Sequence, residues 1–297
     1  MTTTSGLLLI DKPAGLTSHD VVARLRKLFQ ERRIGHAGTL DPMATGLLVV
    51  AVGTSTRLLR FAQVETKRYV GTVQLGVATD SLDGDGSITQ RRAVPELTTE
   101  EVNAVAATMI GSQRQVPPMV SALKVGGRRL HEMAREGLEV ERAPRDIVID
   151  AFYLTPTQQF ESWDFDVTCS VGTYVRVLLS DLSEKLGTVG HLSALRRISS
   201  GHHHVDDART LDELATLSDV TIALAPPARM VDGLESFILD APDVVKMRLG
   251  QRIELNRSFV GDEIAAFDDA GELVGVLRSR GELWKPEIVL SRAGGSS

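Results

Sequence analysis

Apolar residues recur along the 297-residue chain at two spacings, which indicate strands in some segments and helices in others. Runs of consecutive or alternating apolar residues predict strands at 7–10, 47–52, 67–77, 147–154 and 163–170, the last two as a pair. Helical spacing and capping residues predict helices from Thr17 or Ser18 to Phe29, at 99–110 and at 174–186, with a shorter helix at 128–135.

The pattern changes near the dipeptide Pro226-Pro227, where we place a domain boundary. Beyond it, short strands broken by Gly and Asp are predicted at 237–239, 252–255, 263–267, 272–277 and 287–290. We therefore expect a catalytic domain at 1–229, with a basic insertion at 113–146, and a small β-rich domain at 230–297.

Composition narrows the class of protein. A 42% apolar and 24% charged chain is typical of a globular protein. The single cysteine, Cys169, excludes an internal disulfide framework and a cysteine-based zinc cluster. The longest apolar run, 47–52, is far shorter than the roughly 20 residues that span a bilayer, and the N-terminus carries no basic region typical of a signal peptide. We expect a cytoplasmic protein without a membrane partner.

The net charge of −6 argues against a polyanionic partner, but the charges are segregated. Residues 1–70 carry ten basic and five acidic side chains, a balance of +5. Residues 205–243 carry two basic and nine acidic side chains, a balance of −7. A local basic surface is compatible with nucleic-acid binding, although a solvated helix face explains it equally well.

The segment Gly35-His36-Ala37-Gly38-Thr39-Leu40-Asp41-Pro42-Met43-Ala44-Thr45-Gly46 is the richest in candidate chemistry. It places glycines, a histidine and an aspartate between the basic helix and the buried strand at 47–52. Glycine permits close backbone approach and Pro42 fixes φ beside the carboxylate, so Asp41 can be held rigidly as a nucleophile or base. An ordinary Asp-Pro turn is the alternative at this point.

The same segment resembles the signature GH-x-G-x-LDP-x-ATG of the TruB family of tRNA pseudouridine synthases. Further motifs of that family resemble segments of this chain in the same order, at residues 11–18 (DKPAGLTS), 67–69 (KRY), 117–124 (PPMVSALK), 134–137 (AREG), 172–176 (GTYVR) and 191–197 (HLSALRR). Val120 and His131 stand where the family commonly has tyrosines, which puts in question how the insertion grips RNA.

The resemblance implies isomerisation of the uridine at position 55 in the T arm of tRNA to pseudouridine, after the base is flipped out of its stack. It also implies an α+β (mixed α/β) catalytic domain with a mixed, mainly antiparallel sheet and a C-terminal PUA-like RNA-binding domain. No cofactor or metal is expected. We expect the T-arm stem-loop as partner and a monomer that needs no other protein.

The resemblance assigns a role to seven residues. Asp41 is the catalytic carboxylate, which attacks the sugar or the base or assists loss of the C2′ proton. Arg176 is the cation expected to offset the effect of burial on the pKa of Asp41. Tyr69 stacks on the flipped base. The remaining substrate-binding assignments are His36, which fills the space that the base leaves, Tyr174 and Leu195 as pocket walls, and Lys12, as a support of the motif or a phosphate contact.

Two other functions are weighed against this one. The first is an RNA-folding chaperone, as a secondary or a sole role. The second is a carboxylate-based nucleoside or glycoside hydrolase, which normally needs two carboxylates about 5–9.5 Å apart, and no second one accompanies Asp41 in its loop. The acidic loop 80–86 fails the EF-hand pattern and is expected beside the cleft. Adjacent side chains at 202–204 (HHH) are not expected to hold a functional metal.

Overall fold

The computed structural model describes residues 4–63, 66–121, 124–130, 133, 136, 138 and 140–290. Nine of the strands in these ranges form one sheet, in which β1, β3, β12, β4, β11, β10 and β7 lie side by side, with β2 on β3 and β13 on β12. The strands are β1 (Gly6–Lys12), β2 (Ile34–Ala37), β3 (Thr45–Val52), β4 (Lys67–Leu75), β7 (Gly111–Gln115), β10 (Arg145–Pro156), β11 (Ser162–Cys169), β12 (Gly190–Ser200) and β13 (His203–His204).

Every neighbouring pair in this sheet is antiparallel except β3 and β12, which are parallel. The predicted mixed, mainly antiparallel sheet is therefore confirmed. The parallel contact is short and pairs Thr45 with Arg196 and Gly46 with Arg197. It joins the two halves of the sheet immediately after the segment that carries Asp41.

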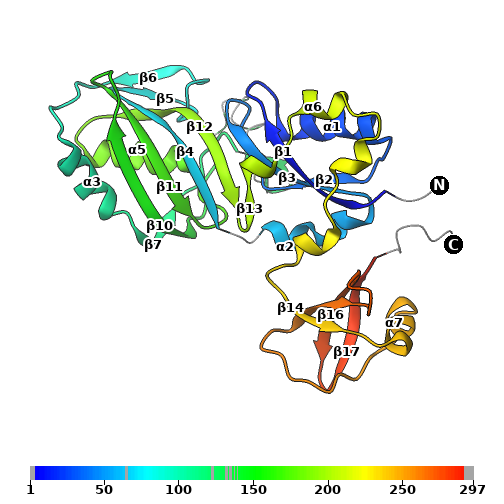
Figure 1. Ribbon diagram of the computed structural model, residues 1–297. Coiled ribbons are helices and arrows are strands. Elements are labelled where there is room, and N and C mark those ends of the chain that lie inside the picture. Colours follow the sequence, from blue (N-terminus) through cyan, green and yellow to red (C-terminus); the bar gives the residue numbers. More distant parts are fainter. Residues whose placement is uncertain are drawn as a thin grey trace.

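Helices cover each half of the sheet (Figure 1). On the half formed by β4, β10, β11 and β12, α3 and α5 bury their apolar side chains against the strands. On the half formed by β1 and β3, α1 and α6 do so. The helices are α1 (Ser18–Phe29), α2 (Leu59–Gln63), α3 (Thr99–Ala107), α5 (Val175–Lys185), α6 (Leu211–Ala215) and α7 (Ala241–Arg248), with 3-10 helices η1 (Gly53–Leu58), η2 (Val205–Asp207), η3 (Val220–Ala223) and η4 (Pro227–Met230).

The first helix begins where its capping residue predicts. Thr17 accepts a hydrogen bond from the backbone N–H of Asp20, whose carboxylate accepts in return from the N–H of Thr17. This capping box satisfies N–H groups that have no partner within the helix. Of the two predicted caps, the structure selects Thr17. Ser18 is instead fully buried, and its hydroxyl accepts from the backbone N–H of Leu40.

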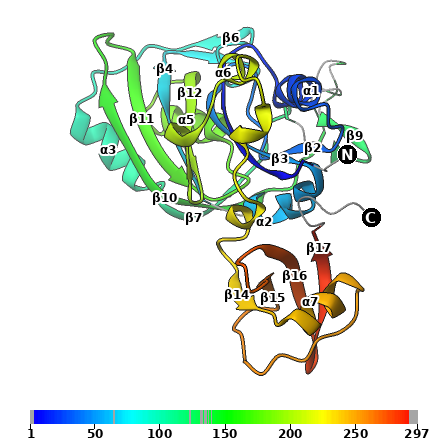
Figure 2. The ribbon, with the colours of Figure 1, turned by 45° about the vertical axis from the view of Figure 1, so that its right-hand side comes forward.

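A separate four-stranded sheet follows near the C-terminus, in the order β14 (Glu235–Ile238), β15 (Glu263–Phe267), β16 (Leu273–Arg280) and β17 (Leu283–Val289). In Figure 1 this sheet lies below α2, on the side away from the large sheet. Figure 2 shows the two sheets on opposite sides of α2 in a second view. Arg60 of α2 binds Glu263, and Arg57 donates to the backbone carbonyl of Val289 at 2.8 Å. Apolar side chains of both parts share one core, so the second sheet is docked on the first part.

One local prediction was wrong in this structure, and another was right only in part. Residues 252–255 form no strand, because Ile253 pairs with Trp284 only through an isolated bridge. The helix predicted at 128–135 starts later than expected: residues 128–129 belong to a hairpin of β8 (Lys124–Val125) and β9 (Arg128–Arg129), whereas Leu130 and Met133 are helical. Gly126 and Gly127 both have positive φ, as a tight hairpin turn requires. Residues 131–132 and 134–135 of that prediction lie outside the described residues.

Helix α7 was not predicted, although Asp240 caps it and Pro242 lies in its first turn. A further hairpin, β5 (Val77–Thr79) and β6 (Ile88–Arg91), carries the acidic loop between its strands. Among the helices in the described ranges, none has both the length and the apolar character needed to cross a membrane.

Candidate active site

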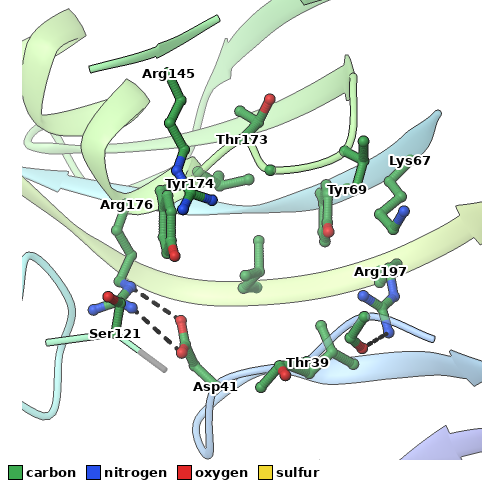
Figure 3. A pocket seen from close by; sticks show the side chains of 16 residues that line it. Thr39, Asp41, Lys67, Tyr69, Ser121, Arg145, Thr173, Tyr174, Arg176 and Arg197 are labelled. Atoms are coloured by element: carbon green, nitrogen blue, oxygen red, sulfur yellow. Dashed lines mark hydrogen bonds and ion pairs between the residues drawn. The ribbon is translucent and has the colours of Figure 1, made fainter. Parts of the chain in front are cut away.

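A pocket of about 350 Å³ opens where the Asp41 segment, β4, β12 and the start of α5 meet (Figure 3). Asp41 lies on one side, and the rings of Tyr69 and Tyr174 extend into the pocket from the opposite side. The lining residues are Gly38, Thr39, Leu40, Asp41, Lys67, Tyr69, Ser121, Arg145, Val171, Gly172, Thr173, Tyr174, Val175, Arg176, Leu195 and Arg197.

The backbone that carries Asp41 is fixed from several directions. Gly46 has a φ of +97°, and a Cβ there would lie 2.3 Å from the backbone oxygen of Arg197, so only glycine allows β3 to approach β12 so closely. The ammonium of Lys12 donates to the carbonyl of Pro42, directly after Asp41. Ser18 holds Leu40, directly before it. The carboxylate is thus presented by a rigid loop.

Arg176 grips this carboxylate with two nitrogens. Its Nε lies 3.0 Å from Oδ2 of Asp41, and its Nη2 donates to Oδ1 at 3.3 Å. The other nitrogen, Nη1, lies 3.3 Å from Oδ2 of Asp83 and donates to the backbone carbonyl of Ser81 at 2.8 Å. The side chain of Arg176 is only 3% exposed, and it links the buried Asp83 to Asp41, whose side chain is 35% exposed toward the pocket.

Burial raises the pKa of Asp41 above its ordinary value, and Arg176 opposes that shift. Asp83 adds to the rise through like-charge repulsion. We expected Arg176 to offset the effect of burial, and here the offset is incomplete. Burial is the largest cause of the rise and exceeds the effect of Arg176, and the charge of Asp83 adds to it.

Asp83 supplies the second carboxylate that the Asp41 loop lacks. It belongs to the acidic loop between β5 and β6, and its side chain is 7% exposed. The hydroxyl of Ser81 donates to Oδ1 of Asp83 at 2.5 Å. The acidic loop therefore reaches the pocket through Arg176. No local pattern singled out Asp83, rather than Asp80 or Asp85, for this contact.

The pocket is lined by three of the predicted site residues, which are apolar or aromatic. Tyr69 on β4 and Leu195 on β12 are each 8% exposed. Tyr174 immediately precedes α5, and burial raises the pKa of both tyrosine hydroxyls. Both phenols are therefore held in their neutral form over a wide pH range. Flat rings beside a carboxylate suit a flipped base, whose π-face can stack on them.

Lys12 and His36 were also predicted for the site, but neither lines the pocket. Lys12 is fully buried and donates to the carbonyls of Pro13, Leu16 and Pro42, so its described contacts are with its own motif and the Asp41 loop. Burial lowers the pKa of Lys12 to about 8. His36 lies on β2, where its ring packs edge-on against His19, and burial lowers its pKa to about 4.

Three basic residues of the pocket were not among the predicted site residues: Lys67, Arg145 and Arg197. Arg197 is fully buried and donates to the backbone carbonyls of Leu47 at 2.6 Å and Gly38 at 3.1 Å. Strand alternation offered a signal, since Arg197 lies two residues after Leu195 and so faces the same side of β12. Its neighbour Arg196 faces the other side and binds Asp11 with two nitrogens at 2.7 and 2.9 Å.

The two departures from the family pattern have different outcomes. The backbone carbonyl of Val120 accepts a hydrogen bond from Nη2 of Arg176 at 3.0 Å, a contact that does not depend on the side chain. His131 lies outside the described residues, as do Ala134 and Arg135. In the histidine triplet, His203 is buried while His204 binds Asp206, and no metal-ligand group is found among the described side chains.

Two family models match the chain. The one described as TruB family pseudouridylate synthase (N terminal domain) matches residues 26–175. The one described as tRNA pseudouridylate synthase B C-terminal domain matches residues 176–237.

Two similar proteins are both named tRNA pseudouridine synthase B. The tRNA pseudouridine synthase B of Mycobacterium tuberculosis (strain ATCC 25618 / H37Rv) is 39% identical over 291 residues, which cover 97% of this chain and 96% of the relative. That of Opitutus terrae is 47% identical over 212 residues, which cover 71% and 88%.

Two solved structures share the fold. An H/ACA RNP bound to a substrate RNA containing 2′-deoxyuridine has a chain that superposes with a TM-score of 0.74 at 20% identity, over 98% of this chain and 87% of that one. A Cbf5-Nop10-Gar1 complex gives 0.72 at 24% identity, over 97% and 86%. At these identities the likeness shows the fold alone.

Proposed function

This chain belongs to the TruB family of pseudouridylate synthases, and from that premise we propose that it isomerises uridine 55 in the T loop of tRNA to pseudouridine. The family relationship supports a tRNA substrate and an isomerase activity. A tRNA substrate also supports action in the cytoplasm. The T arm and position 55 rest on the motifs that the chain shares with the family.

One observation carries the proposal: the bidentate contact of Arg176 with Asp41 in a pocket walled by Tyr69 and Tyr174. Cleavage of a glycosidic bond needs a carboxylate near the anomeric carbon, as a nucleophile or to stabilise positive charge on the sugar. A guanidinium holds that carboxylate in one orientation through two parallel hydrogen bonds. The rings provide a surface for a uracil that has left its stack.

The reaction balances without a cofactor. The C1′–N1 bond breaks, the uracil turns while it stays in the pocket, and a C1′–C5 bond forms. The hydrogen on C5 leaves as a proton, and N1 gains one. We propose that Asp41 acts at the sugar or the base, or assists loss of the C2′ proton, because its carboxylate faces the pocket, whereas Asp83 binds the far side of Arg176.

The remaining parts of the proposal concern the rest of the chain. We propose that the C-terminal β-rich part is a PUA-like RNA-binding domain, with the boundary near residue 230 and a gripping insertion at 113–146. The exposed basic side chains of α1 and the following turn support an RNA contact on the first domain, namely Arg24, Lys27, Arg32 and Arg33. We propose that the enzyme acts as a monomer.

Release of tritium from a T-arm hairpin containing 5-tritiated uridine tests the proposal. The wild type is expected to release it, and Asp41→Asn is expected to bind the hairpin with the wild-type Kd and release none. Free uracil would instead indicate a hydrolase. Binding without release by the wild type would indicate a folding chaperone and would overturn the proposal.

A further inference from the structure

The start of α5 has an unusual cap. Its N-cap residue is Tyr174, whose side chain makes no capping hydrogen bond. Serine, threonine, aspartate and asparagine normally occupy this position, because their short side chains accept from the first N–H groups of the helix. A helix that carries Arg176 in its first turn therefore begins without the usual local support.

The support comes from Gln115, 59 positions earlier in the chain. Its Oε1 accepts from the backbone N–H of Tyr174 at 2.8 Å, and its Nε2 donates to the backbone carbonyl of Tyr174 at 3.1 Å. One side-chain amide thus pairs with both backbone groups of a single residue. The Tyr174 carbonyl also accepts from the N–H of Leu178, the first hydrogen bond of the helix, so both its lone pairs are used.

Gln115 is itself held firmly. It is the last residue of β7, is 5% exposed, and pairs with Arg145 of β10 in the sheet. Pro117 and Pro118, both buried, follow it and restrict the backbone. This short stiff segment ends at Val120, whose carbonyl accepts from Nη2 of Arg176.

Residues 115 and 120 therefore hold the helix start at two points, one at Tyr174 and one at Arg176. The catalytic loop contacts the same guanidinium from the other side, through Asp41. A small rotation of the first turn of α5 would move the Tyr174 ring and the Arg176 fork together. Productive chemistry tolerates such displacements poorly, since reacting groups must be held within about half an ångström.

We infer that Gln115 is a positioning residue for the reaction, which sets the orientation of Tyr174 and Arg176 by pairing with the Tyr174 backbone. It does not line the pocket, and its side-chain hydrogen bonds go to Tyr174, so it acts through the helix start. The inference rests on the proposed function, because it concerns the efficiency of that reaction. Its effect falls on the chemical step, since the surfaces that contact RNA outside the pocket are unchanged.

Gln115→Met tests the inference, because methionine has nearly the same length and removes both hydrogen bonds. Asn103→Leu is the matched control: Asn103 on α3 is partly buried, and its side-chain amide donates to the backbone carbonyl of Leu154 and accepts from the Leu154 N–H, away from the pocket. We expect single-turnover tritium release to fall about tenfold to a hundredfold in Gln115→Met, as for the loss of two hydrogen bonds worth about 1 kcal/mol each. Kd for the hairpin should stay within about twofold of the control, as RNA contacts outside the pocket set it.

Gln115→Glu gives a second measurement should Gln115→Met fail to fold. Glutamate keeps the acceptor for the Tyr174 N–H and loses the donor to the carbonyl, so its rate should lie below that of the wild type. A rate equal to that of Asn103→Leu in every folded Gln115 variant overturns the inference, as does a rate loss matched by an equal loss of affinity. A wild type that releases no tritium overturns the proposed function instead.

Discussion

Arg176 binds Asp41 edge to edge, with Nε 3.0 Å from Oδ2 and Nη2 3.3 Å from Oδ1. The two residues are 135 positions apart in the sequence. Each reaches the contact from a rigid element, Asp41 from the loop before β3 and Arg176 from the first turn of α5. The third nitrogen of Arg176, Nη1, contacts Asp83 and the carbonyl of Ser81, so the Nε–Nη2 edge of the guanidinium faces Asp41.

Arg176→Lys is expected to lower turnover much more than affinity. Lysine keeps the charge but lacks the planar fork, so it cannot hold both oxygens of Asp41 while also reaching Asp83. Loss of two charge-assisted hydrogen bonds predicts a fall in kcat on the order of a hundredfold. Single-turnover rates and hairpin Kd values measure the two effects separately.

Arg92→Lys is the control for that variant, because Arg92 pairs with Glu184 at the other end of α5, where both side chains are largely exposed. It should leave both quantities near the wild-type values. Equal losses of rate and affinity in Arg176→Lys would refute the role given to the Arg176–Asp41 contact.

Asp83→Asn should move the acid limb of the pH–rate profile to lower pH. Asp41 acts as a carboxylate, so the rate rises as pH passes upward through its pKa. Asp83 is one cause of the raised pKa of Asp41, and removing its charge lets that pKa fall. The plateau rate should also drop, since Arg176 loses one of its contacts.

Asp85→Asn is the matched comparison in the same loop. Asp85 is exposed and is the least of the named causes of the Asp41 shift, so its removal should move the limb less. Single-turnover rates between pH 4 and 8 provide the profile. An acid limb that stays in place in Asp83→Asn, or moves to higher pH, would contradict this account of the site.

His36 should make the folded protein less stable in mild acid. Burial lowers its pKa from 6.5 to about 4, so the unfolded chain binds a proton that the folded chain excludes. The resulting stability is fully present above pH 6.5, is lost as pH falls toward 4, and changes little below that value. At pH 5 the loss attributable to His36 is roughly 1–2 kcal/mol.

Urea unfolding of the wild type and His36→Asn at pH 5 and pH 7.5 isolates this contribution. The difference in unfolding free energy between the two pH values should be smaller in the variant. His202→Asn serves as the control, because that histidine is exposed. A variant with the same pH dependence as the wild type would show that folding does not lower the pKa of His36.

Binding of the T-arm hairpin should weaken steeply with salt despite the net charge of −6. Each phosphate contact contributes a slope of about −0.7 to −0.9 to log K against log salt, so three or more contacts give roughly −2 or steeper. Arg24→Gln with Lys27→Gln should flatten the slope. Arg209→Gln, an exposed site in the acidic stretch, should not. Titrations between 50 and 200 mM salt distinguish these results, and an unchanged slope in the double variant would place the contact elsewhere.

Local signals in the sequence predicted the helices α1, α3 and α5 and strands such as β3, but not β12, the strand beside β4 that carries Leu195 and Arg197. Thr17 and Thr98 both make capping boxes that start predicted helices, and the apolar run 47–52 forms the buried part of β3. These features depend on neighbours a few residues apart. Residues 252–255 failed as a strand, because pairing depends on a partner strand that the local pattern cannot supply.

By itself, the sequence determined the family and the identity of the residues at the centre of the pocket, Asp41, Tyr69, Tyr174, Arg176 and Leu195, because short motifs preserve residue type and order. Only the tertiary structure decided that Asp83 would share Arg176 with Asp41, that Gln115 would hold Tyr174, and that Arg197 would brace Leu47 and Gly38. These contacts join residues 59 to 159 positions apart. No periodicity or local motif encodes such a contact, since it forms only when β12, α5 and the acidic loop pack around one pocket.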